Sequence, residues 1–147
     1  MAKFVFRLQS YLGVKEQMEN LKKNEYGVAL RHLEEEKQRK RLLEQELQEN
    51  VTELKNSVRR IIAPPEIRRY NNRIQVLQTW IVEQDLRIKA AEEFAEKKRL
   101  ELVETMKEKK SLETVKEHSY EEYLKDEQRA EQAVVDGIVS YRYAVNE

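Results

Sequence analysis

Few residues in this chain have the types and spacing that catalysis or metal binding would need. Cysteine is absent, and the two histidines are His32 and His118. On one helical rod they would stand on the order of 30 Å or more apart, too far to share a metal ion or a catalytic site. Three scattered glycines cannot form a phosphate-binding loop. We therefore expect no enzyme, no metal site and no cofactor, and we interpret both histidines as surface residues.

Charged residues are abundant but balanced. Lys plus Arg and Asp plus Glu each total 28, so the formal net charge is zero. A dedicated binder of nucleic acid or of an acidic membrane would show a basic excess. The basic run 37–41 has glutamates on both sides, which favours a solvated helix face over a nucleic-acid patch. The many carboxylates have no predicted pocket around them, so paired-acid catalysis has no support.

Two long helices are the elements that must position these residues. The chain is 38% charged and 39% hydrophobic, with three glycines and two prolines, a composition typical of a helical rod. Pro64 and Pro65 must end one helix, because proline lacks the amide donor and disfavours helical geometry in the residue before it. Pro65 and Glu66 suit the first turn of a second helix. The pattern predicts a single domain with helix 1 over about 3–62, a tip at 63–65 and helix 2 over about 65–143.

A seven-residue apolar repeat runs on both sides of the proline pair. Before it the repeat comprises Leu30, Leu33, Lys37, Lys40, Glu44, Leu47, Val51, Leu54, Val58 and Ile61. After it the repeat comprises Ile67, Tyr70, Ile74, Leu77, Ile81, Gln84, Ile88, Ala91, Ala95 and Lys98. Folding about Pro64 sets Val58 opposite Tyr70 and Val51 opposite Leu77, the arrangement of an antiparallel coiled coil. The sequence therefore predicts an all-α, monomeric, antiparallel coiled-coil hairpin with its tip at Pro64-Pro65.

Two irregularities interrupt this predicted seam. Gly27 predicts a stutter, because glycine inside a helix is unfavourable and often marks an irregular turn. Glu44 opposite Gln84 predicts a polar layer that fixes the register at some cost in stability.

The open end of the hairpin carries more apolar surface than its own pairing uses. Phe4 is expected opposite Leu124, close to Tyr120 and Tyr123. The chain beyond Leu124 has no predicted partner within the hairpin, although it contains several apolar residues: Ala130, Ala133, Val134, Ile138, Val139, Tyr141 and Tyr143. An unpaired apolar face of this kind indicates a partner.

Trp80 is the second feature that the fold alone does not require. It flanks the predicted seam, Leu43 flanks the same side on the facing helix, and tryptophan and arginine are enriched in binding hot spots. The candidate surface consists of Leu43, Arg73, Leu77, Trp80 and Arg87. The alternative is that Trp80 folds over Leu77 and only widens the seam.

No apolar run approaches the roughly 20 residues that span a bilayer. The segment 4–8 is too short and too charged for a signal peptide, so we expect a cytoplasmic protein.

Several motifs and the total length resemble one known family. The motifs are Phe4-x-Phe6-x-Leu8-x3-Leu12, Tyr70-x3-Ile74-x2-Leu77-x3-Ile81, and Glu127-x-Arg129-x-Glu131-Gln132 followed by Val135-Asp136-x-Ile138. Together they resemble FliJ, the coiled-coil component of the bacterial flagellar protein-export apparatus.

The resemblance implies a non-enzymatic protein that sits at the centre of the export ATPase hexamer, FliI, and promotes its assembly and activity. It also implies contacts with the export gate protein FlhA and with export chaperones, at the cytoplasmic side of the inner membrane. The residues expected at the ATPase ring are Phe4, Leu8, Val134, Ile138 and Tyr141, and the candidate surface around Trp80 is expected at the gate. The alternative is a generic cytoplasmic coiled-coil spacer or scaffold, while the neutral charge disfavours an RNA-binding hairpin.

Overall fold

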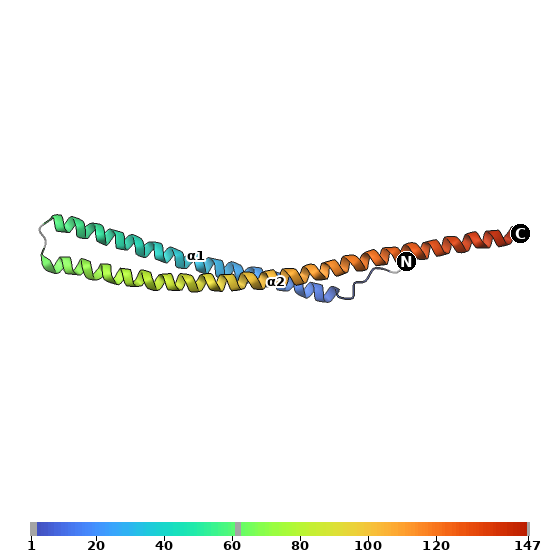
Figure 1. The fold of residues 1–147 in the computed structure, drawn as a ribbon, viewed down its shortest axis with the longest axis horizontal. Helices are drawn as coiled ribbons and strands as arrows, with labels where there is room; N and C mark the ends of the chain where they lie inside the picture. The colour runs from blue at the N-terminus through green and yellow to red at the C-terminus, as the bar shows by residue number, and fades with distance from the viewer. Residues whose placement is uncertain (1–2, 61–62, 147) are drawn as a thin grey trace. The chain divides into compact units, whose positions relative to one another are not determined.

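The computed structural model describes residues 3–60 and 63–146 as two helices, α1 (Gln9–Arg59) and α2 (Pro64–Val145), with no strand in those ranges. Two compact units divide the chain: unit 1 comprises Met1–Asn20 with Val103–Glu147, and unit 2 comprises Leu21–Leu102. Within each unit a part of α1 packs antiparallel to a part of α2 (Figure 1). The all-α hairpin is confirmed, and the assignment of one domain stays a prediction.

The helices meet at the predicted proline pair, with small differences in their bounds. Helix α1 ends at Arg59, and Ile61 and Ile62, expected at its end, lie outside the described residues. Helix α2 begins at Pro64 instead of Pro65 and continues to Val145 instead of Tyr143. Both prolines fit the first turn because the amides there have no helical acceptor.

In unit 2, the predicted seam of α2 is confirmed. Every position of the repeat from Ile67 to Lys98 is buried or half-buried, and Leu77 is fully buried. The seven-residue spacing thus correctly identified the face that α2 turns toward α1.

The seam of α1 was only half correctly predicted. The series Leu33, Lys40, Leu47 and Leu54 is half-buried as expected. The other series is correct at two of its five positions, since Lys37 and Val51 are half-buried. Leu30, Glu44 and Val58 are exposed, and the seam is completed one residue earlier by Ala29, Glu36, Leu43, Asn50 and Ser57. The predicted stutter at Gly27 is wrong, since Lys22 and Ala29 keep the seven-residue spacing across it.

The polar layer also has a different partner from the one predicted. Gln84 Nε2 donates to the Glu36 carbonyl oxygen at 2.9 Å and to the Glu36 carboxylate. The predicted partner, Glu44, is exposed and lies 3.7 Å from Lys40 Nζ. A buried carboxylate and a buried amide need each other's hydrogen bonds, so this pair fixes the register that apolar spacing leaves open.

In unit 1, the chain before α1 is not helical. Helix α1 begins at Gln9 instead of Lys3, and the Gln9 amide donates to the Phe6 carbonyl oxygen at 3.1 Å. In a helix, Phe4 and Phe6 would point to opposite sides. The irregular segment lets Phe6 become buried while Phe4 contacts two tyrosines of α2.

Candidate partner-binding surfaces

The described residues contain no cluster of metal ligands. Within 3–60 and 63–146, no group of three or more His, Cys, Asp or Glu side chains could hold a metal ion. His32 and His118 are both exposed, and each lies next to one glutamate of its own helix. The surfaces of the two units are therefore the places to look for function.

Trp80 stands at the centre of the first surface, in unit 2. Its side chain is 42% exposed, and the Arg73 guanidinium lies 5.1 Å from the centroid of its ring. Arg73 Nε also donates to the Glu46 carboxylate of α1 at 3.1 Å. Because Arg73 is held from both sides, it keeps the indole in one orientation before any partner arrives.

On the side of Trp80 that faces α1, a cavity of about 270 Å³ opens, lined by Leu43, Trp80, Glu83, Gln84 and Arg87. The prediction that Leu43, Trp80 and Arg87 share one stretch of groove agrees with this arrangement. Leu77 is different: it is fully buried and supports the surface from below without offering area to a partner.

On its other side, Trp80 borders a groove that was not predicted from the sequence. The groove measures about 410 Å³ and is lined by Asn72, Gln75, Val76, Thr79 and Trp80. Val76 is 40% exposed, and its place one turn before Trp80 is the signal that could have identified it. Trp80 thus forms a ridge between two shallow grooves, and a side chain in that position can insert into a pocket on a partner.

The second surface belongs to unit 1 and begins with an aromatic cluster. The Phe4 ring lies 5.2 Å from the Tyr120 ring and 5.5 Å from the Tyr123 ring, centroid to centroid. These contacts confirm the predicted position of Phe4. Phe4 and Leu8 also line one cavity of about 720 Å³, whose other wall comes from α2 between Val115 and Glu127.

Beyond this cavity, α2 carries an exposed apolar stripe, which we define as Val134, Ile138, Tyr141 and Val145. The spacing of four, three and four residues places the four side chains on one face. The exposed fractions of Val134, Ile138 and Tyr141 are 63%, 51% and 71%. Tyr123, which contacts Phe4, lies on the same face about three turns earlier, so the stripe continues the face that the N-terminal segment covers.

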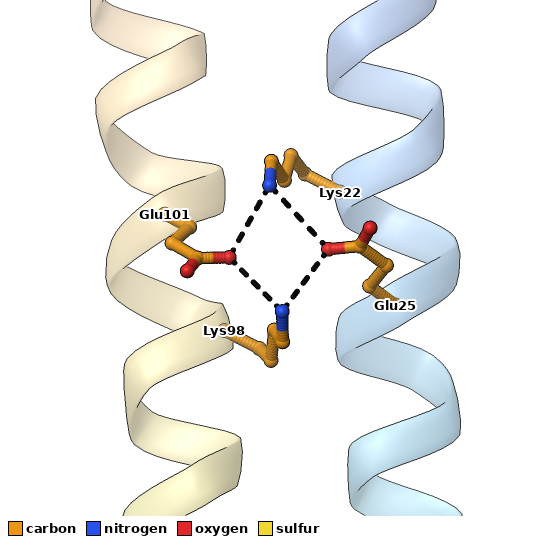
Figure 2. A network of polar contacts seen from close by, with 4 residues as sticks. All are labelled: Lys22, Glu25, Lys98 and Glu101. Carbon is orange, nitrogen blue, oxygen red and sulfur yellow. Dashed lines mark hydrogen bonds and ion pairs between the residues drawn. The ribbon is translucent and has the colours of Figure 1, made fainter.

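A ring of charges lies in the seam of unit 2, and Lys98, the last predicted position of the repeat on α2, is one of its members. Lys22 Nζ contacts Glu25 at 3.5 Å and Glu101 at 3.3 Å, and Lys98 Nζ contacts the same two carboxylates at 3.4 and 3.3 Å (Figure 2). The hydrogen bond to Glu101 raises the pKa of Lys22. The hydrogen bond from Lys22, with one from Lys98, lowers the pKa of Glu101. Charges therefore hold the helices in register here.

Together these features define a class: a coiled-coil hairpin protein with exposed surfaces suited to contacts with partners. Residues 4–147 match the family described as Flagellar FliJ protein, and the chain belongs to that family. No curated protein and no solved structure matches the chain. Membership makes it a component of flagellar protein export in a family that is not catalytic. In the ranges 3–60 and 63–146, neither helix has an apolar stretch long enough to cross a membrane.

Proposed function

We propose that this chain binds the centre of the export ATPase ring, FliI, promotes its assembly and activity, and links it to the gate protein FlhA and to export chaperones. It would do so as a monomer at the cytoplasmic face of the inner membrane. The observation that carries the proposal is the exposed apolar stripe at the end of α2 in a chain of this family.

The apolar stripe is suited to the ATPase contact because folding does not use it. More than half of each of its side chains remains in water. Burying one such side chain fully in an interface contributes about 1.5–3 kcal/mol, so three or four supply a substantial part of a stable contact. Leu8, which is 44% exposed, and the half-buried Phe4 extend this apolar surface within unit 1.

The surface around Trp80 is suited to the gate contact because its parts are already in place. Tryptophan and arginine are the residues most enriched in binding hot spots, and a rigid side chain loses little entropy on binding. Arg73 orients the indole, and Leu43 and Arg87 line the adjoining cavity.

The ATPase contact can be tested by placing a charge on the apolar stripe. We expect Ile138→Asp to abolish stimulation of ATP hydrolysis by the purified ATPase, because a carboxylate cannot be buried in an apolar contact. Ser140→Asp is the matched control: it adds the same charge in the same exposed segment but on the other side of α2. Full stimulation by Ile138→Asp, or equal loss in both variants, would contradict the contact.

The alternative function is a coiled-coil spacer or scaffold without an ATPase partner. A scaffold of that kind would leave ATP hydrolysis unchanged at every concentration of the unmodified chain. The same assay therefore separates the two functions before any variant is made.

A further inference from the structure

The residues nearest the hairpin connection are strongly basic, although the whole chain is neutral. Between residues 55 and 73 there are six basic residues and one acidic residue, Glu66. The basic residues are Lys55, Arg59, Arg60, Arg68, Arg69 and Arg73. The zero net charge, which disfavoured an acidic-membrane binder, thus hides a local excess that lies wholly within unit 2.

Four of these arginines, Arg59, Arg60, Arg68 and Arg69, form what we call the tip cluster. All four side chains are exposed, and in the described part of the chain none of them forms an ion pair. The basic run 37–41 is different, because three of its four basic residues, Arg39, Lys40 and Arg41, have acidic partners. Lys40 lies 2.7 Å from Asp85, and Arg41 lies 3.3 Å from Glu34. Most of the charge is therefore neutralised where the sequence looks most basic, whereas the arginines of the tip cluster are unpaired within the described residues.

The fold itself gives little reason for this cluster. Arg59 is in the last turn of α1, where a cation stabilises the helix dipole. Arg68 and Arg69 lie near the N-terminal end of α2, where the dipole gives a cation no such stabilisation. Like charges on both sides of one connection repel each other, and an anionic partner would relieve this repulsion.

We propose that the tip cluster binds the surface of a membrane that contains anionic lipids. The ends of two helices, each about 10–12 Å wide, present on the order of 200 Å², far below the roughly 800 Å² that each side of a stable protein interface buries. A lipid surface requires no such area, because its negative potential attracts every arginine within a Debye length. The exposed Val58, Ala63 and Pro64 add a little apolar contact at the same end.

The binding is electrostatic in origin, which determines how it should respond to salt. Among the described residues near the connection, Val58, Ala63 and Pro64 offer little apolar area, so we expect most of the binding to be lost once the charges are screened. At about 1 M salt the Debye length is about 3 Å, and the contact is lost.

The test is sedimentation of the purified chain with vesicles of phosphatidylcholine alone or of phosphatidylcholine with phosphatidylglycerol. We expect binding only to the vesicles that contain phosphatidylglycerol, and only at low salt. The double substitution Arg68→Gln and Arg69→Gln should weaken the partitioning about 30-fold, whereas lysine at both positions should preserve it.

The matched control replaces Arg41 and Arg99 with glutamine. It changes the net charge equally, and both arginines are exposed and paired with a glutamate of their own helix. Equal weakening in test and control variants, or no binding to phosphatidylglycerol at low salt, would overturn the proposal. Tighter binding to duplex DNA than to the vesicles at the same salt would also overturn it, in favour of nucleic acid. Stimulation of the ATPase in solution should be the same in all these variants, which separates this contact from the one at the apolar stripe.

Discussion

Replacing Trp80 with alanine should weaken gate binding as well as the fold. In the free chain the change removes the contact with Arg73, worth about 0.5–1 kcal/mol at an exposed site. The ring is 42% exposed, so more than half of its roughly 150–250 Å² is already buried, which adds about 2–3 kcal/mol and brings the total to about 2–4 kcal/mol. In the complex, a hot-spot tryptophan costs about 2 kcal/mol or more, roughly 30-fold in affinity for FlhA.

Leu77→Ala is the control that separates stability from binding. Leu77 is fully buried, and removing a buried leucine costs about 2–5 kcal/mol. In a chain of this length each kcal/mol lowers the melting temperature by about 2–4 °C. Gate affinity, measured well below that temperature, should change little because Leu77 has no surface to offer.

Thermal unfolding and titration with the purified cytoplasmic domain of FlhA measure the two quantities on the same samples. Leu86→Ala, an exposed apolar residue outside the surface around Trp80, should change neither. If Trp80→Ala keeps its affinity within about threefold and loses stability as Leu77→Ala does, Trp80 only widens the seam. The gate surface of Leu43, Arg73, Trp80 and Arg87 would then be refuted.

Three further outcomes follow from the seam and from the hairpin as a monomer. Gln84→Leu should lower the free energy of unfolding, measured in urea, by about 1–3 kcal/mol, because the Glu36 carboxylate loses its buried donor. Leucine at both position 36 and position 84 should restore most of the lost stability. Unchanged stability of the single variant would contradict the role of this pair. Glu101→Gln should be less stable than the unmodified chain at neutral pH. This difference in the free energy of unfolding should shrink as the pH falls below the ordinary carboxyl pKa of 4.5, and it should vanish below the lowered pKa of Glu101. A difference that persists in acid would argue against the charge ring. Sedimentation equilibrium should give 17.7 kDa, and twice that mass would contradict a monomer.

The sequence by itself determined the hairpin and one of its two faces. Pro64 and Pro65 remove amide donors at one place in an otherwise helical pattern, and this local effect needs no tertiary contact. The repeat on α2 is strongly apolar, so its buried face follows from spacing alone. Trp80 could be found by the same means, because a large apolar side chain beside the seam is visible from the pattern, whereas Leu43 was expected beside the seam and lies in it.

Only the tertiary structure decided how α1 faces α2. Between Glu34 and Glu46 charged residues are so frequent that apolar spacing cannot distinguish two phases one residue apart. The hydrogen bonds between Gln84 and Glu36 select one of them, and such a choice depends on side chains that are distant in sequence. The N-terminal segment is a similar case, since Phe4 leaves the helical pattern to meet Tyr120 and Tyr123. The tip cluster also needed the structure, because a sequence counts charges but cannot tell which of them are paired.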